Sequence, residues 1–184
     1  KFYHRHADIS KLVQLIPSTV IGILISVFFG EQISEEQFKT AMAFIIITGV
    51  SITITQKLES RIAHPNKIIS NLIGILGGIS TMVGNAAGPV MTLYFLAMGF
   101  KKNKFIGTAA WFFLSVNLFK VPFHIIFWNT IDVEVFYSGL IMLPLTMTGA
   151  FLGYFIVKFI PERPYKIILI LSIVLSVFKL LLTV

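Results

Sequence analysis

The sequence predicts an all-α polytopic membrane protein, built as an inverted repeat around one broken helical hairpin. Its 184 residues are 56% hydrophobic and only 12% charged, and the mean hydropathy is +0.88. Soluble domains carry about 25% charged residues, so this chain has too few polar side chains to cover a water-soluble core. A lipid bilayer is the better solvent for so much apolar surface.

The charge pattern argues against a nucleic-acid partner. The net charge is +7, but most basic residues lie in short connections between apolar stretches, as they do on the cytoplasmic side of membrane proteins. No aromatic and basic face accompanies them, and no nucleic-acid-binding motif is present. The chain has no cysteine, which excludes disulfides, thiolate metal sites and cysteine nucleophiles.

Apolar stretches define the predicted membrane segments. A spanning helix needs about 20 mostly apolar residues, and five stretches satisfy this requirement: 12–30, 38–55, 106–128, 135–157 and 165–184. The stretch 68–100 is too long for one span and is interrupted by Gly77-Gly78 and by the run from Gly84 to Pro89. We expect two helical halves there, joined by backbone that glycine keeps flexible.

The loop charges predict that this broken stretch enters and leaves the membrane on one side. If 68–100 crossed the bilayer, basic loops would lie on both sides. If it forms a re-entrant hairpin, every basic loop is cytoplasmic, and the two acidic loops, near Glu35 and near Asp132, are external. The positive-inside rule therefore favours the re-entrant hairpin.

An internal repeat relates the two parts of the chain. Residues 15–39 align without a gap to residues 142–166, and seven of the 25 pairs are identical, among them Pro17 with Pro144 and Gly22 with Gly149. With one hairpin between them, the two copies cross the membrane in opposite directions, as in many secondary transporters. Residues 1–66 would then be the C-terminal part of the first repeat, with two spans, and 67–184 the second repeat. The offset also predicts roughly 70 further residues upstream, carrying another span and a second glycine-rich hairpin.

The interruption of the broken stretch is the first candidate binding site. Its candidate residues are Gly77, Gly78, Ser80, Thr81, Gly84, Asn85, Ala86, Ala87, Gly88 and Pro89. Irregular backbone at membrane depth is tolerated only where protein or a water-filled cavity surrounds it. Pro89 suits the first position of a helix, whose free N–H groups attract an anion. The alternative is that the glycines only allow close helix packing.

Lys120 is the second candidate, 14 residues after Ile106 in a predicted span. A cation at the centre of a bilayer costs at least about 2.5 to 3.5 kcal/mol, so we expect a partner. No acidic residue lies in the middle of a predicted span, which favours a bound anion. The alternative is that the side chain extends to the membrane interface near Trp128.

Other polar residues of the same span complete the candidate site. Asn117 and His124 share a helix face with Lys120, while Thr108 and Trp111 lie earlier in the span. We include Thr108, Trp111 and Asn117 in the site; the alternative for Trp111 is that it faces lipid or packs against a neighbour. We interpret His124 as a packed polar residue instead of a proton carrier.

Catalysis has no support in the sequence. There is no Ser-His-Asp arrangement, no pair of intramembrane carboxylates and no histidine-rich metal spacing. His4 and His6 form an isolated pair without further ligands. We therefore expect neither an enzyme nor a cofactor nor a bound metal.

The run from Gly74 to Pro89 resembles the hallmark of the sulfite exporter TauE/SafE family, also called the TSUP family. The runs 104–110 and 117–122 look like the segment that follows it. The resemblance implies a multi-pass protein of the bacterial inner membrane, with two related halves, that exports sulfite, organosulfonates or related small anions. Members usually have a glycine-rich hairpin in each half, whereas one is present here, and Ile79 stands where many have a third glycine.

These observations lead to a secondary transporter of a small sulfur-containing anion as the first hypothesis. The oxygens of sulfite and sulfonates readily accept hydrogen bonds from amides and amines. An anion-selective channel would use the same donors without alternating access, and a transporter of a different small anion is a further alternative. An accessory membrane protein and a membrane enzyme rank below these. The expected partners are a small anion and membrane lipid, and the sequence is compatible with a homo-oligomer.

Overall fold

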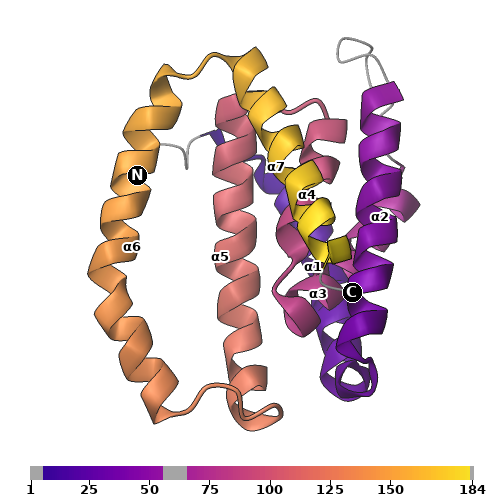
Figure 1. Ribbon diagram of the computed structural model, residues 1–184, viewed down its shortest axis with the longest axis vertical. Coiled ribbons are helices and arrows are strands. Elements are labelled where there is room, and N and C mark those ends of the chain that lie inside the picture. The colour runs from indigo at the N-terminus through magenta and orange to yellow at the C-terminus, as the bar shows by residue number, and fades with distance from the viewer. Residues whose placement is uncertain (1–5, 56–65, 183–184) are drawn as a thin grey trace.

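The computed structural model describes residues 6–55 and 66–182, which form a bundle of α-helices without a β-strand (Figure 1). The helices are α1 (Ile9–Phe29), α2 (Glu35–Thr55), α3 (Lys67–Gly84), α4 (Ala87–Ala97), α5 (Lys102–Ile126), α6 (Val133–Phe159) and α7 (Glu162–Leu182), and a short 3-10 helix, η2 (Gly30–Gln32), follows α1. The predicted all-α polytopic fold is thereby confirmed at this level. His4 lies outside the described residues.

The helix lengths agree with a chain that crosses a membrane several times. Among the described residues, α1, α3, α5 and α6 are long and apolar enough to span a bilayer, and α4 is apolar but shorter. Three of these helices, α1, α5 and α6, coincide with predicted spans to within about four residues. The other two predicted spans coincide with α2 and α7, which have 21 residues each and include side chains outside the described set.

The predicted interruption at Gly77-Gly78 is wrong, because α3 continues through both glycines to Gly84. The helix ends at Asn85, which adopts the left-handed conformation with φ 51° and ψ 29°. Asparagine is one of the few residues besides glycine that adopts this conformation readily. The backbone N–H groups of Asn85 and Ala86 both donate to the carbonyl of Ser80, which closes the end of the helix.

The second half of the hairpin starts directly after this turn. Because α4 begins at Ala87, Pro89 occupies the third helical position and not the predicted first one. Its missing N–H still costs no helical hydrogen bond there, since the first turn of a helix has no intrahelical acceptors. The helix then runs back along α3, and the buried Tyr94 hydroxyl donates to the buried Ser70 Oγ at 3.0 Å. The chain thus returns to the end of the bundle where α3 starts.

Glycines bring α1 and α3 into close contact. A Cβ atom at Gly78 would overlap the carbonyl oxygen of Thr19, and one at Gly22 would overlap the carbonyl oxygen of Ile75. Small residues allow membrane helices to approach through their backbones in this way. At Gly78, therefore, the structure supports the alternative interpretation of the sequence, in which glycine serves close helix packing.

Hydrogen bonds and an ion pair at the start of α5 give the directions of α1 and α6. Asp8, just before α1, forms an ion pair of 2.8 Å with Lys104. The Lys102 amine donates to the carbonyls of Val157 and Ile160 at the end of α6, at 3.0 and 2.6 Å. One end of the bundle therefore holds the start of α1 and the end of α6, so these helices run in opposite directions (Figure 1).

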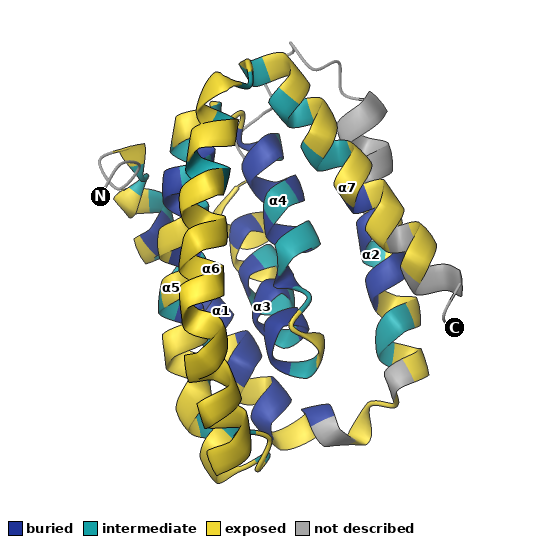
Figure 2. Ribbon diagram, turned by 60° about the vertical axis from the view of Figure 1, so that its left-hand side comes forward, coloured by how far each residue is buried: buried dark blue, intermediate teal, exposed yellow. Residues whose placement is uncertain are grey.

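Helix α6 makes little contact with the rest of the bundle. None of its residues is buried, and it is exposed along its whole length in Figure 2. By contrast, α1 buries eight residues. In the repeat predicted from the sequence these two helices correspond, and their aligned positions differ strongly in burial.

We predict that Gly78→Ala destabilises the protein. The added methyl group meets backbone atoms of α1, which cannot move aside as a side chain can, and overpacking of this kind costs about 1 to 3 kcal/mol. The midpoint of thermal unfolding of the purified protein in detergent measures the effect. Gly139→Ala is the matched control, because a Cβ atom at this glycine of α6 meets nothing within 4 Å. Equal midpoints for the two variants would contradict the close α1–α3 contact.

Candidate functional site

Lys120 of α5 binds the tip of the α3–α4 hairpin. Its Nζ atom lies 2.6 Å from Asn85 Oδ1 and 3.3 Å from both the carbonyl oxygen and the Oγ1 atom of Thr81. These acceptors belong to the last turn and the cap of α3, where the helix dipole favours a cation. The partners that the structure gives Lys120 are thus neutral oxygens, and the bound anion expected from the sequence stays a prediction. Lys120 lies six residues, about 9 Å along the helix axis, from the end of α5.

The charge of Lys120 is not neutralised by these contacts. Among residues 6–55 and 66–182, no carboxylate pairs with its amine. Two of its three hydrogen bonds are 3.3 Å long, whereas an ammonium group and an anionic oxygen typically approach to 2.7 to 2.9 Å. An anion at this position would therefore be a stronger acceptor than either atom of Thr81.

The start of α4 adds backbone donors next to the same turn. Ala86 caps the helix without a side-chain hydrogen bond, and the part of the chain that the structure describes offers no acceptor to the N–H groups of Ala87 and Gly88. A Cβ atom at Gly88 would meet nothing within 4 Å. The turn therefore combines the Lys120 ammonium group with free N–H groups at a helix N-terminus, which is the chemistry that binds anions.

The remaining hairpin candidates build the hairpin and do not offer donors at its tip. The Ser80 hydroxyl donates to the carbonyl of Leu76 at 2.6 Å and contacts Met42 Sδ on α2. Gly77 faces Met91 of α4, and Gly84 lies against the ring of Phe38.

The structure separates two of the α5 candidates from Lys120. Thr108 is buried near the other end of α5, about 18 Å away along the axis, where its hydroxyl accepts a hydrogen bond of 2.9 Å from the Asp8 N–H. Trp111 is 42% exposed, and its nine-residue separation from Lys120 places it on the opposite face of the helix. Asn117 is exposed one turn before Lys120, and its amide has no hydrogen-bond partner among the described residues.

His124 is held by neighbours at the end of α5. Its Nδ1 atom lies 2.7 Å from Thr130 Oγ1, and its ring meets the edge of Trp128 at a centroid distance of 5.4 Å. These contacts agree with the interpretation of His124 as a packed polar residue. The indole N–H of Trp128 in turn donates to the carbonyl of Val27 at 3.4 Å, which connects this end of α5 to α1.

Sequence reasoning missed the polar contacts at the start of α5. The loop lysines served only to predict topology, yet Lys102 binds the end of α6 and Lys104 pairs with Asp8. The sequence did contain an indication of these contacts, because three lysines, Lys101, Lys102 and Lys104, lie within four positions directly after the hairpin. It also missed Gly22 as the packing partner of α3, although Ser18, Gly22 and Ser26 recur at the four-residue spacing of one helix face.

These features define a polytopic helical membrane protein with a broken hairpin, and helices broken in this way are typical of secondary transporters. A family model described as Sulfite exporter TauE/SafE matches residues 1–180, and the chain belongs to that family. Its members are membrane transporters and not enzymes. No curated protein and no solved structure matches the chain significantly.

We predict that Lys120→Met leaves the stability of the protein nearly unchanged. The substitution removes one short charged hydrogen bond, to Asn85, worth about 1.5 to 3 kcal/mol, and two long contacts to Thr81 that contribute little. It also removes the cost of placing an ammonium group in an apolar bundle, which reaches about 2.5 to 3.5 kcal/mol at the centre of a membrane. Because the two terms offset each other, we expect the free energy of unfolding in detergent to change by less than about 1 kcal/mol. A much larger loss would show that Lys120 serves mainly to hold the fold.

Proposed function

We propose that this chain is a secondary transporter that exports sulfite or a related small sulfur-containing anion, such as an organosulfonate, across the bacterial inner membrane. Membership of the TauE/SafE family supports the class of substrate. The observation that carries the proposal is the position of Lys120, whose ammonium group lies 2.6 Å from Asn85 at the hairpin tip without a carboxylate partner among the described residues.

The anion would bind between Lys120 and the first turn of α4. One oxygen would accept from Lys120 Nζ in exchange for the long contacts to Thr81. A second oxygen would accept from the free N–H groups of Ala87 and Gly88. Asn117 lies one turn from Lys120, and its side-chain amide would supply a further donor. Sulfite suits this set because its three oxygens share the negative charge and accept several hydrogen bonds at once.

Most of the other predicted site residues take supporting roles in this proposal. Ser80, Gly77, Gly78 and Gly84 shape the hairpin, and Thr108 fixes the start of α5 to the segment before α1. Trp111, on the opposite face of α5, takes no part in the anion site. Discrimination between sulfite and sulfonates would depend on the space beside Gly88, where a Cβ atom meets nothing within 4 Å.

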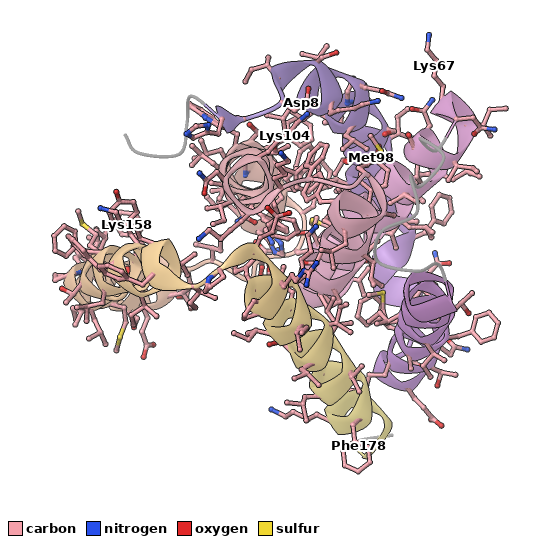
Figure 3. The ribbon with its side chains drawn as sticks, turned by 90° about the horizontal axis from the view of Figure 1, so that it is seen from above. Asp8, Lys67, Met98, Lys104, Lys158 and Phe178 are labelled. Carbon is pink, nitrogen blue, oxygen red and sulfur yellow. The ribbon has the colours of Figure 1, made fainter. Side chains whose placement is uncertain are left out.

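We further propose that α3 and α4 form a re-entrant hairpin and that the chain is an inverted repeat, divided into residues 1–66 and 67–184. The antiparallel course of α3 and α4 supports the first proposal. The opposite directions of α1 and α6, which correspond in the repeat, support the second. The lysine-rich end of the bundle, shown from above in Figure 3, would face the cytoplasm. It comprises Lys11, Lys67, Lys101, Lys102, Lys104, Lys158 and Lys166.

Single cysteines test this topology in an otherwise cysteine-free chain. We expect Lys67→Cys and Asn103→Cys, on either side of the hairpin, to react with a membrane-impermeant thiol reagent only from the cytoplasmic side. Glu134→Cys should react only from the periplasm, because it lies at the opposite end of the bundle. Labelling of Lys67→Cys and Asn103→Cys from opposite sides would show that the hairpin crosses the membrane.

The transport site is tested in proteoliposomes loaded with sulfite. We expect Lys120→Met to reduce the initial rate of sulfite transport at least tenfold, because a charged hydrogen bond is worth about 1.5 to 3 kcal/mol. Asn117→Ala should cause a smaller loss. Lys179→Met is the control, since it removes the same charge from a different apolar helix, α7.

The same preparation separates a transporter from a channel. Transport by alternating access is stimulated by sulfite on the opposite side of the membrane, whereas flux through a channel is not. Unchanged transport by Lys120→Met would refute the proposed site but not the class of protein.

A further inference from the structure

A cleft of about 610 Å³ opens at the lysine-rich end of the bundle. Its walls come from the segment before α1, from the connection between α4 and α5, and from the start of α7. Figure 3 shows Asp8, Lys104 and Met98 gathered at this end. The cleft lies at the start of α5, whereas Lys120 lies near the end of that helix, so the two sites are separate.

The cleft has an excess of positive charge. Both carboxylates in its lining already have cationic partners, Asp8 with Lys104 at 2.8 Å and Glu162 with Lys166 at 3.0 Å. Burial raises the pKa of the Asp8 carboxyl, but the hydrogen bonds from Lys104 and from the Lys11 N–H, together with the charges of these lysines, lower it below its ordinary value. Asp8 therefore remains ionised and fully engaged with Lys104 at neutral pH.

Three lysines of the lining have no carboxylate partner among the described residues. The Lys102 amine binds neutral carbonyl oxygens of α6 and so keeps its full charge. Lys101 is exposed, and the Lys11 amine contacts Gln14 Oε1 at 3.4 Å and forms no ion pair with a described carboxylate. The described part of the cleft thus presents several ammonium groups to a ligand without an internal anion to balance them.

The first turn of α5 adds donors to this wall. Lys101 caps the helix without a side-chain hydrogen bond. The N–H groups of Lys102, Asn103 and Lys104, which line the cleft, have no acceptor in the part of the chain that the structure describes. The positive end of the 25-residue helix therefore points into the same space as the ammonium groups.

We propose that this cleft binds a phosphate group, presented as the headgroup of an anionic phospholipid. A phosphate oxygen accepts from the α5 N-terminus while Lys11 and Lys101 neutralise its charge. Basic pockets between membrane helices on the cytoplasmic side bind anionic headgroups. Beside the cleft, the exposed apolar faces of α6 offer contact to acyl chains (Figure 2). A lipid there would connect the start of α1 to the starts of α5 and α7.

Thermal-shift titration of the purified full chain tests the site. The probes are short-chain phosphatidylglycerol, short-chain phosphatidylcholine and inorganic phosphate. We expect phosphatidylglycerol, but not phosphatidylcholine, to raise the unfolding temperature with the logarithmic dependence on concentration that binding to one site gives. Lys11→Gln and Lys101→Gln should each weaken the apparent affinity about fivefold, as expected for one lysine near an anionic lipid.

Lys158→Gln is the matched control, because this lysine lies at the same end of the bundle, on α6, but does not line the cleft (Figure 3). A shift by inorganic phosphate that depends on Lys11 and Lys101 also supports a phosphate site and identifies the free ion as a ligand. Equal weakening by Lys158→Gln would show nonspecific attraction to the surface and overturn the proposal. An absence of any shift with phosphatidylglycerol and with phosphate at millimolar concentration would overturn it as well.

Discussion

An ammonium group inside an apolar helix bundle needs oxygen atoms around it, and in this protein the end of a broken helix supplies them. Because α3 stops at Asn85 in the left-handed conformation, the carbonyl of Thr81 and the amide oxygen of Asn85 are available at its end. The Lys120 ammonium group donates hydrogen bonds to both oxygens. The interaction holds α5 against the hairpin without a carboxylate among the described residues, so the positive charge remains available to an anionic ligand.

The rest of the bundle positions this interaction. Glycines bring α1 and α3 to backbone contact at Gly22 and Gly78, and the hydrogen bond between Tyr94 and Ser70 fixes α4 against α3. At the other end of α5, Asp8 and Lys102 connect this helix to α1 and α6. The helix that carries Lys120 is therefore fixed at both ends, while the hairpin it contacts is supported by α1. An anion that replaced the contacts of Lys120 with Thr81 would change the hydrogen bonds that hold α5 against the end of α3 and the start of α4.

Much of the fold follows from the sequence, because a membrane helix must be apolar over a length that the bilayer sets. The helix ends consequently fall close to those predicted. The break at Gly77-Gly78 was predicted wrongly because glycine permits both a flexible joint and close packing. The choice between these depends on a partner, Gly22, more than fifty positions away in the chain. The acceptors of Lys120 lie 35 and 39 positions from it, and no local pattern identifies such pairs. The position of Trp111, in contrast, could be predicted from the sequence. Nine residues separate it from Lys120, which places the two side chains on opposite faces of α5.

The central claim is that Lys120 at the hairpin tip binds the transported anion, and equilibrium binding tests it without the complications of transport. Thermal unfolding of the purified protein would be followed with increasing sulfite, and with sulfate, taurine, sulfoacetate and thiosulfate for comparison. A ligand that binds only the native state raises the free energy of unfolding by RT ln(1 + L/Kd), where L is the ligand concentration and Kd its dissociation constant. The account predicts an increase in unfolding temperature that follows this logarithmic dependence for sulfite or one of these relatives and that is lost in Lys120→Met. An increase of the same size in that variant would contradict the account.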